Sequence, residues 1–323
     1  MTAPNTRWFV GITTLALCNI SGLSFADSYE ITDSFGKHRL QKPPERVVVT
    51  DWTLLEQLLE LDITPVGAPE LDRYRRYVVQ PALSKDMVDI GLRRSPDLQI
   101  LQSLEPDAII IGTDQKALAR ALSRTAPVFY YNNFSKKYRD NGEKARARFL
   151  QLADLFRRKA LAQTKLAAMD KDIKSLRQKL NQHFVGGLPK VTLIRFSKAK
   201  KAFDEQKILV YGHNSIPMHV IEKLGMTSNV GTGYSKWGHE EWPVSRLKDI
   251  TKDIILYIEP LDTNEDFLLS EEWLSIPAVQ QGRIHPMPPA WSYGGAMSLL
   301  YNARAIYRVL MERPNLSSAQ SPR

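Results

Sequence analysis

A long run without glycine or proline is the feature that most constrains this chain. Neither residue occurs from Glu143 to His183, and they are the two that most readily interrupt a helix. Apolar residues recur within the run at spacings of 3 and 4, namely Leu166, Met169, Ile173, Leu176 and Leu180. Such a stripe predicts an amphipathic helix, and about two heptads are too few for a coiled coil. We expect a helix over residues 158–183, about 38 Å long, which is enough to bridge two lobes.

Short apolar segments alternate with helical patterns on both sides of this run. Before it, buried strands are expected at 47–50, 63–66, 108–112 and 128–130, and helices at 54–61, 96–104 and 117–124. After it, strands are expected at 191–196, 208–211, 254–257 and 284–286, and helices at 215–224 and 296–311. Strands that are apolar on both faces and alternate with helices are typical of a mainly parallel sheet. The sequence therefore predicts an α/β fold, with two Rossmann-like α/β lobes joined by one long interdomain α-helix.

The two ends of the chain fit neither lobe. Arg7 precedes an apolar run, residues 8–18, that is too short to span a bilayer. Ser24-Phe25-Ala26 then offers small residues at the two positions that a signal peptidase reads, so we expect an export signal over residues 1–26. A polar tail that we expect to be disordered covers residues 313–323. The N-terminal lobe would then cover residues 27–157, and the C-terminal lobe residues 184–312.

Cysteine usage bears on both localisation and chemistry. Cys18 is the only cysteine, and Leu15-Ala16-Leu17-Cys18 faintly resembles a lipoprotein cleavage box. Because Leu17 is bulky where that box has a small residue, we favour soluble export to the periplasm over a lipid anchor. Cleavage after Ala26 would leave a mature chain without cysteine, which excludes disulfides and thiol catalysis.

The chain is basic, with a formal net charge of +9. Basic exported proteins can meet membranes, nucleic acid or anionic small molecules. The cations here are scattered along the sequence, and no nucleic-acid-binding motif accompanies them. We therefore expect no nucleic-acid partner, and an anionic ligand stays open.

Aromatic residues occupy loops where a ligand would lie. The segment from Pro288 to Gly295 holds Trp291 and Tyr293 between prolines and paired glycines, so it is a loop that cannot bury both rings by itself. Such rings pack on another element or face a ligand. Ligands of α/β lobes bind beyond the carboxyl ends of the strands. That rule also selects the loops of Trp52, Arg93 and Trp237 as walls of a cleft between the lobes.

Several short motifs now make a family recognisable. They are Arg46-Val47-Val48 with Asp51-Trp52, Glu56-Gln57-Leu58-Leu59, Asp89-Ile90-Gly91-Leu92-Arg93 with Pro96, Gly212-x-Asn214-Ser215, Trp237-Gly238, Val244-Ser245-x-Leu247 and Pro289-Ala290-Trp291-x-Tyr293-Gly294. In this order and spacing, from about Arg46 to Leu310, the chain resembles the periplasmic ferric-hydroxamate (ferrichrome-type) siderophore-binding proteins of ABC iron importers. The resemblance implies the helical-backbone class of periplasmic binding proteins, in which a rigid interlobe helix permits little closure.

The resemblance also implies a binding site. Arg93 would hydrogen-bond the hydroxamate oxygens, and the aromatic walls would be Trp52, Trp237, Trp291 and Tyr293, with Tyr77 at a position where the family can carry Trp. Trp52 is equally consistent with a core position, because it follows a buried strand. The ligand would be a pre-formed iron(III)-siderophore complex, so we expect no cofactor and no protein ligand to the metal. The partners would be an inner-membrane permease with its ATPase, and we expect a monomer.

Three positions depart from the family pattern. Polar Asp114-Gln115 stands where the family often has a Tyr that reaches the chelate, and Ser292 stands where an aromatic residue is expected. Both changes predict a roomier and more polar pocket. Arg120 occupies the place of an acid that docks the permease, so either Glu105 or Asp114 takes that role or docking differs.

Other functions remain open at this stage. A protein of the same fold could bind a carboxylate or catecholate siderophore, haem or cobalamin, but only Arg93 is clearly placed as a basic pocket residue, with Lys236 and Arg195 as further candidates. The six histidines show no i, i+4 pair, which argues against a metal site. An exported hydrolase would need a triad such as Ser215 with His213 or His239. Ser215 is better explained as a helix cap, and we expect no enzyme.

Overall fold

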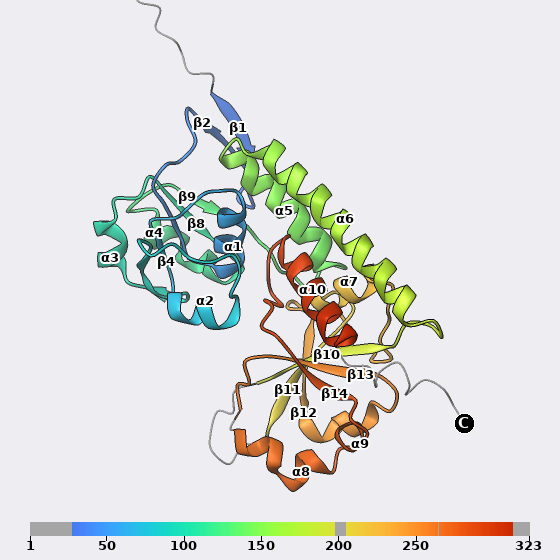
Figure 1. The fold of residues 1–323 in the computed structure, drawn as a ribbon. Coiled ribbons are helices and arrows are strands. Elements are labelled where there is room, and N and C mark those ends of the chain that lie inside the picture. Colours follow the sequence, from blue (N-terminus) through green and yellow to red (C-terminus); the bar gives the residue numbers. More distant parts are fainter. Residues whose placement is uncertain (1–27, 198–204, 264, 313–323) are drawn as a thin grey trace, which may run out of the picture.

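The computed structural model describes residues 28–197, 205–263 and 265–312 (Figure 1). The expected export signal over residues 1–26 and the expected tail over residues 313–323 lie outside the described residues. A hairpin of β1 (Tyr29–Thr32) and β2 (Lys37–Leu40) precedes the first lobe. The Tyr29 hydroxyl donates a 2.7 Å hydrogen bond to the Leu155 carbonyl, which ties the hairpin to the long helical segment.

The N-terminal lobe is built on a five-stranded parallel sheet in the order β5-β4-β3-β8-β9. Its strands are β3 (Val47–Val49), β4 (Gly67–Ala68), β5 (Val88–Asp89), β8 (Ala108–Ile111) and β9 (Val128–Tyr130). Its helices are α1 (Trp52–Glu60), α2 (Leu71–Tyr77), α3 (Leu98–Ser103) and α4 (Ala119–Leu122), and β6 (Gly91–Leu92) pairs with β7 (Ser95–Pro96). The strand expected at 63–66 begins only at Gly67, because Pro65 has no N–H to donate to a ladder.

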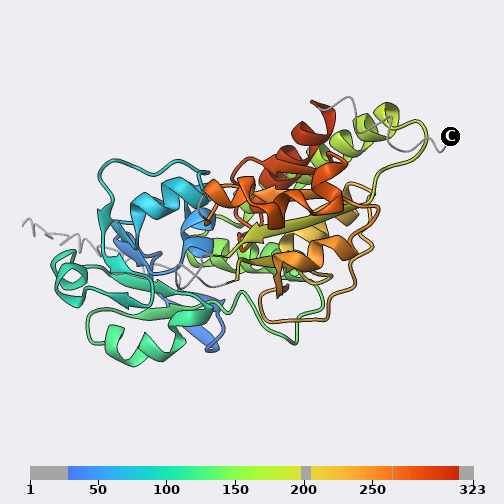
Figure 2. The same ribbon diagram turned by 90° about the horizontal axis from the view of Figure 1, so that it is seen from below.

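The C-terminal lobe has a mixed five-stranded sheet in the order β12-β11-β10-β13-β14. Its strands are β10 (Val191–Phe196), β11 (Lys207–Tyr211), β12 (His239–Pro243), β13 (Ile254–Ile258) and β14 (Ile284–Met287). Strands β10, β13 and β14 run parallel, whereas β11 is antiparallel to both of its neighbours. The helices are α7 (Ile216–Lys223), α8 (Glu271–Leu274), α9 (Pro277–Gln280) and α10 (Ser298–Met311). Figure 2 shows the two lobes side by side, each with its own sheet.

The run without glycine or proline holds two helices, and the second agrees with the helix expected over residues 158–183. Helix α5 (Asn141–Leu155) ends before α6 (Lys159–His183), and Arg157 between them has a left-handed backbone with φ of 52°. Phe156 is buried at this break, and the Arg157 guanidinium lies 4.4 Å from the centre of the Tyr29 ring. The packing of Phe156 and Tyr29 therefore turns the chain where its propensity alone would continue the helix. Helix α6 then runs beside α5 and α10, along both lobes (Figure 1).

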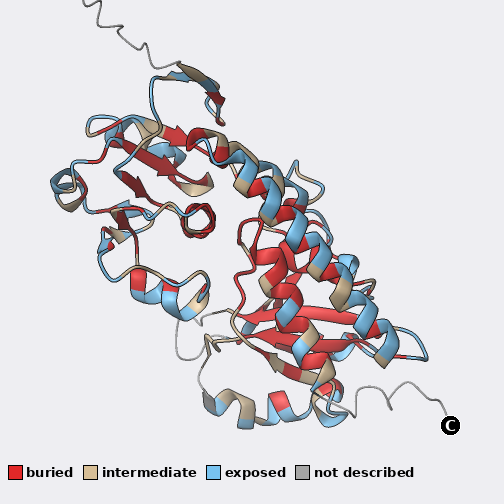
Figure 3. Ribbon diagram, turned by 45° about the horizontal axis from the view of Figure 1, so that its top comes forward, coloured by how far each residue is buried: buried red, intermediate tan, exposed pale blue. Residues whose placement is uncertain are grey.

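The lobes share one continuous hydrophobic core. A single cluster of buried apolar side chains extends from the N-terminal sheet through α5 and α6 to α7 and α10, and Figure 3 shows these inner faces in red. The two-lobe α/β fold with a long connecting helix is thus confirmed, while the exact domain boundaries stay predictions. A core that crosses between the lobes makes independent lobe motion costly, because opening would expose apolar surface.

A hydrogen-bonded contact between α1 and the start of α10 fixes the position of the aromatic loop. The buried Glu56 carboxylate accepts from the Ser298 hydroxyl at 2.6 Å, the Ser298 N–H at 2.8 Å and the Gly295 N–H at 3.2 Å. The Thr53 hydroxyl donates to the Tyr293 carbonyl at 2.6 Å. A Cβ on Gly294 would lie 2.2 Å from Ser298 Cβ, so glycine is required for this approach. These contacts press the loop of residues 291–295 onto the N-terminal lobe.

Candidate ligand-binding site

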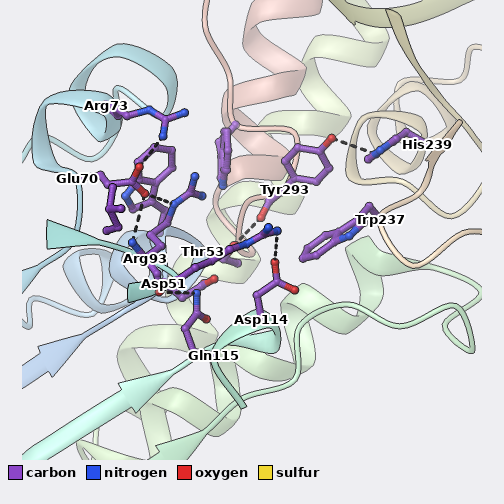
Figure 4. Close-up of a pocket in the computed structure, with 14 residues that line it drawn as sticks. Asp51, Thr53, Glu70, Arg73, Arg93, Asp114, Gln115, Trp237, His239 and Tyr293 are labelled. Carbon is purple, nitrogen blue, oxygen red and sulfur yellow. Dashed lines mark hydrogen bonds and ion pairs between the residues drawn. The ribbon is translucent and has the colours of Figure 1, made fainter. Parts of the chain in front are cut away.

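A cavity of about 570 Å³ lies between the two lobes (Figure 4). Its volume falls within the range of about 300–1,000 Å³ that is usual for small-molecule sites. The N-terminal lobe contributes side chains that follow β3, β4, β6 and β8, and the C-terminal lobe contributes the loops before β12 and after β14. The site therefore lies at the carboxyl ends of parallel strands, as the sequence predicted.

Arg93 projects into this cavity in a fixed orientation. Its guanidinium carbon lies 3.7 Å from the centre of the Trp52 ring, which is a close cation–π contact. Its Nε donates a 2.6 Å hydrogen bond to Glu70 Oε2. Among the described residues, no side chain or carbonyl accepts from the two terminal nitrogens of Arg93. A planar pair of donors is thus aimed at the cavity and available to an oxygen-bearing ligand.

Glu70 holds two arginines and was not foreseen from the sequence. Besides Arg93, it pairs with Arg73 through Oε1 at 2.5 Å (Figure 4). Burial would raise the pKa of Glu70, but the hydrogen bonds and charges of Arg93 and Arg73 outweigh it and lower that pKa. Glu70 is therefore ionised near neutral pH. Glu70 lies 23 residues before Arg93, and no local pattern links the two.

The aromatic residues form a continuous wall. The ring centres of Trp52 and Trp291 lie 5.3 Å apart, those of Trp291 and Tyr293 also 5.3 Å, and those of Tyr293 and Trp237 5.9 Å. Trp52 is only 1% exposed, and its Nε1 donates to the Pro69 carbonyl at 2.9 Å. Trp52 is thus a core residue that also lines the cavity. Four of the six predicted site residues meet around the cavity through these rings.

Tyr293 is held at its hydroxyl by a histidine. The hydroxyl lies 3.0 Å from His239 Nδ1 (Figure 4). Burial lowers the pKa of His239, so the ring is neutral at pH 7, and its tautomer sets the direction of the hydrogen bond. Burial also raises the pKa of Tyr293, which keeps its hydroxyl neutral. His239 therefore orients the ring that closes the C-terminal side of the cavity.

Asp114 connects the two lobes across the cavity. It accepts from Lys236 of the C-terminal lobe at 2.9 Å and from Arg94 of its own lobe at 2.9 Å. Burial would raise the pKa of Asp114, but the hydrogen bonds and charges of the two cations lower it. Asp114 and Gln115 both line the cavity. Asp114 is partly exposed and bound by two cations, whereas Arg120 is exposed.

Tyr77 and Ser292 lie outside the lining of the main cavity. Tyr77 does not line the main cavity; its hydroxyl donates a 2.6 Å hydrogen bond to Asp262 of the other lobe, and its ring borders a smaller adjoining cavity. Ser292 does not widen the pocket, because it is 1% exposed and its hydroxyl lies 2.5 Å from that of Tyr211. Ser292 therefore faces Tyr211 of β11, whereas its neighbours Trp291 and Tyr293 line the cavity.

The alternative sites considered from sequence have structural explanations. The buried Ser215 hydroxyl accepts from the Met218 N–H at 3.0 Å and caps α7, as expected. Away from the cavity, the ligating atoms of Asp140, Glu143 and His219 lie within 4.8 Å of one another. Asp140 caps α5 and accepts from His219, so hydrogen bonding within the fold accounts for its place in this cluster.

Comparisons with known proteins agree with this arrangement. Residues 47–290 match the family of periplasmic binding proteins, and the chain belongs to that family. It is similar to the iron(3+)-hydroxamate-binding protein FhuD of Escherichia coli (strain K12), with 27% identity over 273 residues, 83% of this chain and 88% of that protein. It is also similar to the Fe³⁺-Desferal-bound siderophore-binding protein FhuD from Vibrio cholerae, with 40% identity and a TM-score of 0.77 over 83% of this chain and 98% of that one. The catecholate-siderophore-binding protein VctP from Vibrio cholerae, 18% identical with a TM-score of 0.63 over 89% of this chain and all of that one, shares the fold.

Proposed function

We propose that this protein is the periplasmic substrate-binding component of an ABC importer, and that it captures iron(III)-hydroxamate siderophores. The observation that carries the proposal is the Arg93 guanidinium, which is stacked on Trp52, anchored by Glu70 and directed into an aromatic cavity. The two FhuD proteins, similar over most of this chain, support the same ligand class.

The charge pattern of the cavity fits a metal that is already chelated. Three carboxylates line the cavity, and each is engaged within the protein: Glu70 and Asp114 are each bound by two cations, and Asp51 caps α1 through the Leu54 N–H. Neither Glu70 nor Asp114 has the unengaged oxygens that a bare ferric ion would need. A hexadentate hydroxamate fills the coordination of iron and leaves a ring of oxygens with partial negative charge, which a guanidinium fork can bind. The aromatic wall covers the apolar scaffold of the chelate.

Membership of the periplasmic binding protein family supports a role in delivering the chelate to a permease. The relatives are transport proteins that bind substrates, and none of the described helices is both long and apolar enough to span a membrane. We place this protein in the periplasm, from where it would deliver its chelate to an inner-membrane permease with its ATPase. Secretion into the periplasm can be checked by cell fractionation of the full chain.

A fluorescence titration tests the ligand class. Trp52, Trp237 and Trp291 lie at the cavity, so a bound ferric chelate should quench their emission. We expect saturable quenching at micromolar concentrations by at least one of ferrichrome, ferrioxamine and aerobactin, with haem and cobalamin as controls. Quenching by haem or cobalamin alone would assign another ligand, and the absence of saturable quenching by all five would refute the proposal.

A further inference from the structure

A second, smaller cavity adjoins the main one. Its volume is about 180 Å³, and it shares Trp52, Arg93 and Trp291 with the main cavity. Its other walls include Tyr77 of the N-terminal lobe and Arg195 and Asp262 of the C-terminal lobe. Sites for a whole small molecule usually exceed about 300 Å³. The smaller cavity therefore has room for one substituent of a ligand whose body fills the larger one.

Arginines dominate the charge of this smaller cavity. The guanidinium carbons of Arg195 and Arg73 lie 4.9 and 5.7 Å from the centre of the Tyr77 ring. Together with Arg93, three guanidiniums line the cavity, and Asp262 is the acidic residue among its lining side chains. Glu70 neutralises part of this charge by pairing with Arg73 and Arg93. Three cations thus face two carboxylates, and the balance is positive.

Arg195 is buried and keeps donor capacity. It is 6% exposed, although arginine rarely lies so deep without close pairing. Its Nη2 lies 3.6 Å from Asp262 Oδ2, which is longer than the roughly 2.7–2.9 Å of a charge-assisted hydrogen bond. Asp262 is bound more closely by the Tyr77 hydroxyl, at 2.6 Å. Arg195 also hydrogen-bonds Tyr211, whose pKa is raised by burial, while the charge and hydrogen bond of Arg195 oppose that rise. The remaining donors of its guanidinium are available to a ligand.

We propose that this cavity, the Arg195 subsite, binds a carboxylate carried by the siderophore. A carboxylate is planar and doubly accepting, so it matches a guanidinium fork, and Tyr77 and Trp291 flank its stem. The preferred ligand is then an iron(III) hydroxamate with a free carboxylate, held at its oxygens by Arg93 and at its carboxylate by Arg195. This inference rests on the proposed function and adds a ligand class to it.

The test compares chelates that differ only in the tail. Desferrioxamine with an acetyl group on its terminal amine is neutral at that end. A succinyl or a glutaryl group at the same amine instead adds a free carboxylate, on a shorter or a longer stem. Binding of the three ferric chelates is measured by tryptophan quenching. We expect the better of the two carboxylated chelates to bind about tenfold more tightly than the acetylated one, and the difference to shrink with added salt.

Variants locate the effect. Arg195→Gln should bring the carboxylated chelates to the affinity of the acetylated one, whose own binding is unchanged and reports intact folding. Asp262→Asn should act in the opposite direction, because it removes the acid that competes for Arg195. Arg76→Gln is the matched control, since Arg76 lies 5.5 Å from the Tyr77 ring but outside the cavity.

The outcomes separate this inference from the proposed function. Equal affinity of the three chelates for the unmodified protein, or an equal loss for all three in Arg195→Gln, overturns the subsite and leaves hydroxamate binding intact. Failure of all three chelates, and also of ferrichrome and aerobactin, to bind the unmodified protein overturns the proposed function itself.

Discussion

Arg93→Ala is the substitution that most directly probes the site. The guanidinium is anchored through Nε to Glu70 and stacked on Trp52, so its terminal nitrogens are held toward the cavity before a ligand arrives. The alanine substitution removes those donors but does not leave Glu70 unpaired, because Arg73 remains bound to the same carboxylate. The loss in affinity then reports mainly the contacts between arginine and ligand.

The magnitude follows from the kind of bond. Hydrogen bonds to charged groups contribute roughly 1.5–3 kcal/mol each. Since about 1.4 kcal/mol corresponds to a tenfold change in Kd, the variant should bind a ferric hydroxamate roughly 10- to 150-fold more weakly. The Kd of Arg93→Lys should lie between those of the unmodified protein and Arg93→Ala, because a lysine keeps the charge but lacks the planar pair of donors.

Tryptophan quenching measures the Kd of each variant. The matched control is Arg75→Ala on α2, since Arg75 is exposed, pairs with Asp72 and does not line the cavity. Thermal melts of the free proteins establish that each variant is folded. A Kd for Arg93→Ala within twofold of the unmodified protein would remove Arg93 from the ligand contacts and refute the reasoning from its orientation.

Three further predictions concern the interlobe contact and the aromatic wall. Gly294→Ala should lower the free energy of unfolding by about 1–3 kcal/mol through overpacking, whereas Gly186→Ala, where a Cβ meets nothing within 4 Å, should change the melting temperature little. Burial raises the pKa of Glu56 from 4.5 to about 8, so the folded protein holds that proton more tightly than the unfolded chain does. The contribution of Glu56 to the free energy of unfolding is full below about pH 4.5 and is lost as the pH rises through about 8. Denaturant unfolding over pH 4–9 should therefore show a steeper decline in that free energy for the unmodified protein than for Glu56→Gln. Equal declines in the two proteins would contradict the raised pKa of Glu56. Trp237→Ala should weaken ferric hydroxamate binding roughly tenfold, since a large aromatic contact is lost, and an unchanged Kd would place the ligand away from this wall.

Local pattern accounts for much of the fold. The buried strands at Val47–Val49 and Ala108–Ile111 are continuous apolar runs, which is what a parallel sheet covered on both faces requires. Ser215 caps its helix through its own side chain, and that interaction spans only three residues. The break at Arg157 agrees with the start of the helix expected over residues 158–183, but the contact of Arg157 with Tyr29 could not be foreseen, because Tyr29 is far away in sequence.

The site divides in the same way. Arg93 and the aromatic residues could be named from their loops and motifs, but Glu70 and Asp262 could not, since they reach Arg93 and Tyr77 only through tertiary contacts. Arg93 was expected as the clearly placed cation with Lys236 and Arg195 as further candidates, and the structure adds Arg73 and Arg94 to the cavity lining. Charged side chains from several loops converge in the cavity, and a linear sequence carries no sign of that convergence.

The sequence by itself determined the alternation of strands and helices, the long connecting helix and the loops that bear aromatic rings, because each follows from interactions between residues a few positions apart. Only the tertiary structure decided that Trp52 is at once core and wall, that Ser292 turns away from the cavity, and that Tyr77 bonds to Asp262 across the lobes. Those outcomes depend on which surfaces meet when two lobes pack on one another. The physical reason is distance: hydrogen bonds and ion pairs act over a few ångströms, and the fold alone brings distant segments that close.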